Sequence, residues 1–242
     1  MARQSFAYGD DRIEYEILFT PLKGNKVAIH VHPDGSVQVG APDGKELPAI
    51  HRAVLRRARW IKSHVDECRR QRAQALPRTY RSGESIFYLG RRYQLKVKER
   101  SSRDAAVKLT RGKVFVETPS RDPIVIRERL AGWYRKRAAD VFERRLNEIV
   151  DHVVWLDRIP NWRLVRMQKQ WGSCSPEGVI LLNPHLVKAP RECVDYVICH
   201  ELCHLQEHNH SPRYYRLLKQ VMPHWESIKA KLDGMAELLL NE

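Results

Sequence analysis

The amino-acid sequence predicts an α+β protein. Several short stretches alternate apolar and polar residues, the period of half-buried strands, while two long stretches carry apolar residues at helical spacing. The predicted strands and helices do not alternate one by one along the chain. They follow the order sheet, helix, sheet, helix and then a helix-rich end, which is typical of α+β folds rather than of a parallel doubly wound sheet.

Residues 13–41 predict a small antiparallel sheet, because alternating stretches are separated by turn sequences at 33–35 and 42–44. Residues 47–75 contain no glycine and have apolar residues at helical spacing, so we expect one helix there. Its outer face is strongly basic and carries Arg52, Arg56, Arg59 and Lys62.

Strands return in the next part of the chain around two turn sequences, at Gly90 and at Arg111-Gly112. A long amphipathic helix is then expected over residues 122–152. We therefore expect a basic, sheet-rich N-terminal region over residues 1–120 and a second domain over residues 121–242. The remaining expected elements are strands at 85–98, 106–116, 162–167 and 179–182, and helices at 190–208, 212–221 and beyond Pro223.

The composition excludes several classes of protein. The chain has 242 residues, of which 43% are hydrophobic and 30% charged, as in soluble globular proteins with a sizeable core. No apolar run reaches the roughly 18 residues of a membrane helix. The first residues lack the apolar core of a signal peptide. We expect a cytoplasmic protein without membrane contact.

The positive charge is unevenly distributed. The net charge is +14, yet residues 151–242 hold 11 basic and 11 acidic side chains, so the whole excess lies in residues 1–150. Residues 52–103 alone hold 16 basic and 4 acidic side chains. Such a region favours polyanions, and we expect it to contact nucleic acid or another polyanion. The alternative is an arginine-rich solvated surface.

The sequence His200-Glu201-Leu202-Cys203-His204 fits the pattern H-E-x-x-H on a helix. Because four residues make about one turn, both imidazoles project from one face about 6 Å apart and can reach one metal ion. Glu201 is rotated from that pair, so it can contact a metal-bound water without ligating the metal. The pattern predicts a zinc site in which Glu201 takes the proton of the attacking water.

A catalytic zinc usually has three protein ligands and one water. Three ligands on one straight helix would span about 12 Å, so the chain must turn before the third. We favour His210, because Asn209 tolerates the left-handed conformation that such a turn uses. The alternatives are His208, Glu207 and Glu226.

These residues lie among longer motifs, namely 171–174, 180–183, 194–205, 209–211 and 222–223. Together they resemble the YgjP-like family of zincin metallopeptidase-like proteins, which are similar to the SprT, WLM and minigluzincin groups. The resemblance implies a zincin-like metallopeptidase domain with an H-E-x-x-H active-site helix, in which His200, His204 and His210 hold one Zn²⁺ per chain and Glu201 is the general base. It also implies that the strand near Val179–Leu182 flanks that helix and can align an extended substrate.

Other residues near the motifs are candidates for substrate binding. Trp171, Gly172 and Ser173 resemble a family feature whose backbone N–H groups or hydroxyl can meet an oxyanion, although a tight turn with a packed tryptophan is the simpler interpretation. Tyr214 follows the third histidine closely. It can stabilise an oxyanion, or it can pack its helix onto the core.

We therefore expect a zinc-dependent hydrolase, metallopeptidase-like, that cleaves a peptide-type bond. Two alternatives stay open. The basic half favours a metal-dependent hydrolase of nucleotide phosphoanhydrides, a nucleoside triphosphate pyrophosphatase, because arginine clusters bind phosphate well. The resemblance to SprT-like proteins also allows a nucleic-acid-associated protease. The expected partner is accordingly a peptide or a nucleotide substrate.

Overall fold

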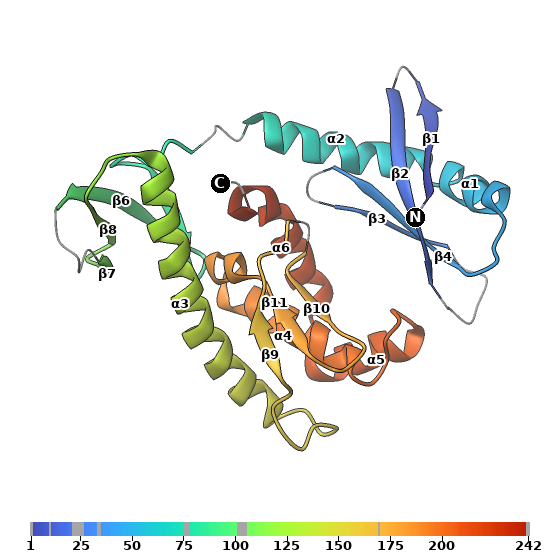
Figure 1. Ribbon diagram of the computed structural model, residues 1–242. Helices are drawn as coiled ribbons and strands as arrows, with labels where there is room; N and C mark the ends of the chain where they lie inside the picture. Colours follow the sequence, from blue (N-terminus) through green and yellow to red (C-terminus); the bar gives the residue numbers. More distant parts are fainter. Residues whose placement is uncertain are drawn as a thin grey trace. The chain divides into compact units, whose positions relative to one another are not determined.

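The protein forms two compact units, Met1–Leu76 and Pro77–Glu242, in a computed structural model (Figure 1). The structure describes residues 2–9, 11–20, 27–32, 35–74, 78–100, 106–168 and 170–240. Both units combine helices with sheets, so the predicted α+β class is confirmed. Within these described ranges, no helix has the length and apolar character needed to cross a membrane.

The first unit is a four-stranded sheet followed by two helices. The sheet order is β1-β2-β4-β3, and β2 pairs with β4 in parallel, so the sheet is mixed and not antiparallel as predicted. The next strand in the chain after β2 is β3, at the outer edge of the sheet, and β4 lies between these two strands. β4 is antiparallel to β3 and therefore runs parallel to β2. The strands are β1 (Ala2–Tyr8), β2 (Asp11–Thr20), β3 (Ala28–Val31) and β4 (Val37–Pro42).

The expected helix over residues 47–75 consists of two helices, α1 (Leu47–Leu55) and α2 (Ala58–Gln74), which are separated by a turn at Arg56 and Arg57. Both helices bury their apolar side chains in the same core as the sheet. Burial of such side chains is the main stabilising contribution to a unit of this size. The helix residues in that core are Ile50, Val54, Ala58, Ile61 and Val65.

The second unit begins with a sheet of the same strand order as the first, β5-β6-β8-β7, again with one parallel pair in its centre. A long helix, α3, follows and buries one face in the larger core. The chain then forms a three-stranded sheet and a helix-rich end (Figure 1). The elements are β5 (Ser85–Tyr88), β6 (Arg91–Glu99), β7 (Val107–Thr110), β8 (Lys113–Thr118), α3 (Pro123–Val150), β9 (Trp162–Leu164), β10 (Gly172–Cys174), β11 (Ile180–Leu182), the 3-10 helix η1 (Pro184–Lys188), α4 (Arg191–His204), α5 (Pro212–Val221) and α6 (Trp225–Leu240).

The units divide between residues 76 and 77, whereas the sequence predicts a boundary between residues 120 and 121. The tip of the β5–β6 hairpin explains the difference. The backbone N–H groups of Leu89 and Gly90 donate to carbonyls of η1 at 2.9 and 3.0 Å. Gly90 has φ +74° and lies so close to Pro190 that an added Cβ would be 2.8 Å from its ring. The second sheet is therefore bound to the segment that leads into α4.

An ion-pair cluster joins α3 to α4. The guanidinium of Arg145 donates to both carboxylate oxygens of Asp195, at 2.5 and 3.0 Å, and also contacts Glu148, which pairs with Arg191 at 2.8 Å. The side chains of Arg145 and Asp195 are 10% and 18% exposed. Burial raises the pKa of Asp195 even with Arg145 beside it, so this carboxylate depends on its partner.

We expect Arg145→Ala to lower the free energy of unfolding by about 3–5 kcal/mol, because it leaves Asp195 buried without its cation. Urea denaturation monitored by circular dichroism measures the change. The exposed neighbour Arg144 provides the matched control, and Arg144→Ala should have almost no effect. An equal loss in both variants would refute a role for the buried pair.

Candidate metal centre

Helix α4 presents two histidines on one face. His200 and His204 are four residues apart, and their ring centroids are 5.0 Å apart. The helix itself is almost wholly buried in the larger core, since most of its residues from Cys193 to Cys203 are inaccessible to solvent. Burial fixes the orientation of the helix. The imidazoles therefore project from a rigid support.

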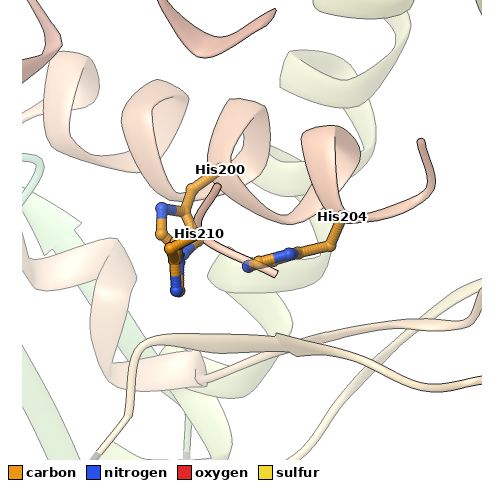
Figure 2. Close-up of side chains that lie close together, drawn as sticks. All are labelled: His200, His204 and His210. Atoms are coloured by element: carbon orange, nitrogen blue, oxygen red, sulfur yellow. The ribbon is translucent and has the colours of Figure 1, made fainter. Parts of the chain in front are cut away.

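The chain turns after α4 and returns with a third histidine. The C-cap of α4 is Leu205, and α5 begins with Ser211 as its N-cap, so His210 stands directly before the next helix. Its Nε2 is 3.1 Å from Nε2 of His200. One ring nitrogen of each of the three histidines lies within 4.8 Å of the others. Figure 2 shows the three side chains gathered at one place.

These three nitrogens fit a zinc ion. Zn–N bonds of about 2.0–2.1 Å in a tetrahedron place two ligand nitrogens about 3.3 Å apart, close to the 3.1 Å between His200 and His210. Nδ1 of His204 lies 3.1 Å from the carbonyl of Glu207 and donates to it, which leaves Nε2 free to ligate. Burial lowers the pKa of His200 and of His204. Both therefore stay neutral, as metal ligands must be.

The other residues considered as a third ligand do not join this cluster. His208 and Glu226 are exposed and lie outside the group of ligand atoms, and Glu207 contributes its backbone carbonyl to His204. Among the described residues, the structure thus brings together His200, His204 and His210.

Glu201 lies beneath strand β10, at an edge of the three-stranded sheet β10-β11-β9, which is called the small sheet below. Its side chain is 5% exposed, and burial raises its pKa to about 8. Gly172 of β10 lies directly against it, because a Cβ at this glycine would be 2.7 Å from Oε1 of Glu201 and 3.0 Å from Val197. The absence of a side chain at residue 172 therefore allows the strand to approach the carboxyl group closely.

Tyr214 has a different place from the one expected of a substrate-binding residue. Its side chain is completely buried, and its hydroxyl donates to the backbone carbonyl of His200 at 3.1 Å. Its ring stacks on His204 at 4.6 Å. Tyr214 therefore supports two of the histidines from within the core. Of the other candidates, Trp171, Gly172 and Ser173 are half-buried in or beside β10.

A column of stacked rings lies beside His210, and no local sequence pattern predicts it. Tyr215 stacks on His210 at 6.1 Å, Trp225 stacks on Tyr215 at 5.3 Å, and Tyr196 stacks on Trp225 at 6.5 Å. The column connects α4, α5 and α6 to the histidine that precedes α5. Its sequence signal is weak, since Tyr196 and Trp225 are 29 residues apart.

A family model described as "YgjP-like, metallopeptidase domain" matches residues 25–235. The chain belongs to the YgjP-like family. This confirms the resemblance seen in the sequence, and it supports a metal-dependent hydrolase of the metallopeptidase type.

Two solved structures are similar to this YgjP-like chain. The metallopeptidase zymogen of Pyrococcus abyssi abylysin is 24% identical, with a TM-score of 0.33, and the match covers 42% of this chain and 94% of that chain. The metallopeptidase zymogen of Methanocaldococcus jannaschii jannalysin is 22% identical, with a TM-score of 0.35, and the match covers 40% and 96%. No curated protein matches the chain.

The strand near Val179–Leu182 is β11, and it contacts α4 of this YgjP-like chain as the resemblance implied, but β10 contacts the helix more extensively. The sheet order is β10-β11-β9, so β11 is central and β10 is an edge strand. The carbonyl of Trp171 accepts from the N–H of Asn183, and the N–H of Ser175 donates to Val179, both toward the β11 side. In an antiparallel pair, successive residues direct their backbone N–H and C=O groups alternately toward and away from the partner strand. The backbone groups of Gly172 and Cys174 therefore point away from β11, toward the outer edge of β10, which is called the free edge below.

We expect Gly172→Ala to move Glu201 and to lower the free energy of unfolding by about 1–3 kcal/mol, because the new methyl group overlaps the carboxyl group. Thermal denaturation measures the change. Gly132 of α3 is the matched control, since a Cβ there meets nothing within 4 Å. Gly132→Ala should be neutral or stabilising. A neutral Gly172→Ala would contradict the close approach.

The raised pKa of Glu201 predicts a pH dependence in metal-free protein. A carboxyl group that titrates near pH 8 when folded, and at 4.5 when unfolded, makes the folded state less stable as pH rises through this interval. Glu201→Gln removes that loss. In EDTA, we expect the variant to exceed the wild type in stability by more than about 1 kcal/mol at pH 8.5 and by much less at pH 5. Urea titrations at both pH values measure the difference, and a pH-independent difference would refute the assignment.

Proposed function

We propose that this chain is a zinc-dependent metallopeptidase in which His200, His204 and His210 hold one zinc ion and Glu201 acts as the general base. The observation that carries the proposal is the convergence of three ring nitrogens within 4.8 Å of one another, two of them on helix α4, which also carries the buried carboxyl group of Glu201. A structural zinc site has no need of such a group, and it usually closes with four protein ligands.

The chemistry follows from these residues. A zinc ion held by the histidines supplies Lewis acidity, which acidifies water and polarises a substrate carbonyl. The carboxylate of Glu201 accepts the proton that water gives up as it attacks the carbonyl carbon, and it then delivers that proton to the departing amide nitrogen. Burial raises the pKa of Glu201 to about 8, whereas a cation nearby favours its charged form. The metal-loaded site is therefore the state in which Glu201 serves as a base.

The free edge of β10 supports an extended peptide as the substrate. The backbone groups of Gly172 and Cys174 face that edge, and Gly172 lies against Glu201. A peptide that adds to this edge as a further strand gains main-chain hydrogen bonds. The scissile bond of this peptide would then lie beside the carboxyl group of Glu201. A nucleotide phosphoanhydride cannot form such a ladder, and for this reason we favour the peptide.

The test uses the full zinc-loaded chain with two sets of substrates. A library of extended peptides is analysed by mass spectrometry, and a panel of nucleoside triphosphates is analysed for released phosphate and pyrophosphate. Peptide cleavage that stops on chelation and returns with zinc is the expected result. Pyrophosphate release without peptide cleavage would replace the proposal with the phosphoanhydride hydrolase.

We also propose that the basic residues within 52–103 contact a polyanion. Within the described part of the chain, no carboxylate pairs with Arg52, Arg56, Arg57 or Arg59, and all four are exposed. The range spans both units, and its residues 75–77 and 101–103 lie outside the described ranges. Retention on immobilised DNA that falls steeply with salt would support this contact. Retention that is absent at low salt would exclude it.

A further inference from the structure

An open pocket of about 460 Å³ lies between α3 and β9, in the second unit. Figure 1 shows the two elements side by side. Four residues of α3 line the pocket. The small residues Gly132 and Ala139 line it at either end, and Arg135 and Lys136 lie between them in the sequence. These positions follow the spacing i, i+3, i+4, i+7, so they share one face of α3.

Strand β9 supplies the opposite wall through Trp162, Arg163 and Leu164. The lining therefore holds three cations and no carboxylate. Within the described residues, neither Lys136 nor Arg163 forms an ion pair. Three like charges around one hollow repel each other, and an anion between them removes that repulsion.

The backbone of β9 adds hydrogen-bond donors to this wall. The carbonyl of Asn161 accepts from Ile180, and the N–H of Val165 donates to Leu182, so these residues face β11. The backbone groups of Trp162 and Leu164 consequently point to the other side, toward α3. The carbonyl of Leu164 confirms this direction, since it accepts from Nη1 of Arg135 at 3.4 Å.

We propose that this pocket is a phosphate-binding site, separate from the histidine cluster and independent of the proposed function. Arg135, Lys136 and Arg163 neutralise the phosphate, and the N–H groups of Trp162 and Leu164 donate to its oxygens. The site lies on the β9 side of the small sheet, whereas Glu201 lies under the β10 edge at the other side.

The geometry selects a compact anion over an added strand. The guanidinium of Arg135 already donates to the carbonyl of Leu164, so an added strand would have to compete with Arg135 for this acceptor of the β9 edge. A phosphate group also suits the donor set better than one carboxylate, because it offers more acceptor oxygens and a larger charge to three cations. Two sources can supply it, namely a free phosphate or the backbone of a single-stranded nucleic acid.

The test is isothermal titration of the zinc-loaded full chain with inorganic phosphate and, separately, with a short oligothymidylate. We expect one saturable site for at least one probe. The triple variant Arg135→Gln, Lys136→Gln, Arg163→Gln should weaken binding at least about tenfold. The control Lys108→Gln, Arg111→Gln, Lys113→Gln removes the same charge from exposed positions of the same unit outside residues 52–103, and it should bind like the wild type.

A second variant keeps every charge and fills the pocket. Gly132→Leu places a branched side chain at a lining position where a Cβ meets nothing within 4 Å, and it should also abolish saturable binding. Binding of phosphate itself identifies the free anion as a ligand, and binding of the oligonucleotide alone identifies nucleic acid as the source. The proposal fails if neither probe saturates, if the control triple variant weakens binding equally, or if Gly132→Leu binds normally.

Discussion

The Glu201→Gln variant should retain its zinc at the wild-type ratio and lose hydrolytic activity by about 10²–10⁴-fold. The amide has nearly the shape of the carboxyl group, so the close contact with Gly172 is preserved. It cannot accept the proton of the attacking water. Initial rates on the best peptide of the library, together with metal analysis of the same samples, measure both parts of the prediction.

Glu226→Gln provides a control for the loss of one carboxylate in the same unit. Glu226 is exposed on α6 and outside the histidine cluster, so its variant should keep full activity. Full activity in Glu201→Gln would show that another group takes the proton. Loss of zinc from that variant would instead give Glu201 a part in binding the metal.

The second large effect is expected at His210. His210→Ala leaves two histidines for the metal, and zinc measured by mass spectrometry should fall from about one per chain to a small fraction. The protein must be purified without a histidine tag and without added metal. His208→Ala is the matched control, because His208 is exposed, lies two residues away and takes no part in the cluster.

Either of two results would contradict this ligand set. Full zinc occupancy in His210→Ala would place the third ligand elsewhere. Loss of zinc from His208→Ala would show that the turn before α5 presents a different ring to the metal. Metal-free unfolding curves separate these outcomes from a general loss of stability, since His210 is exposed and its removal should change stability little.

Local sequence patterns were sufficient for the helical part of the site. The spacing of His200 and His204 on an apolar helix predicted two rings on one face, and Asn209 predicted a turn before His210. The long helix over 122–152 was expected for the same reason, since its apolar period is regular and α3 covers Pro123–Val150. Each of these features depends on residues that are near neighbours in the sequence.

The features that the sequence did not reveal depend on distant pairs. The contact between Gly172 and Glu201 joins residues that are 29 apart, and no periodicity signals it. The strand order that makes both four-stranded sheets mixed is likewise set by a crossover and not by the alternation of any strand. The N–H of Leu89 donates to the carbonyl of Val187. This contact joins the second sheet to the segment before α4, so that the sheet and the histidine cluster belong to one unit, Pro77–Glu242.

The first turn of α5 has a consequence for how the metal site forms. Ser211 caps this helix by accepting from the N–H of Tyr214, and it directly follows His210 in the chain. The helix start and the proposed third ligand are therefore fixed together, so we expect local opening of α5 and release of zinc to belong to one cooperative unit. Amide hydrogens of α5 should accordingly exchange faster once zinc is removed, while those in the core of α3 keep their protection.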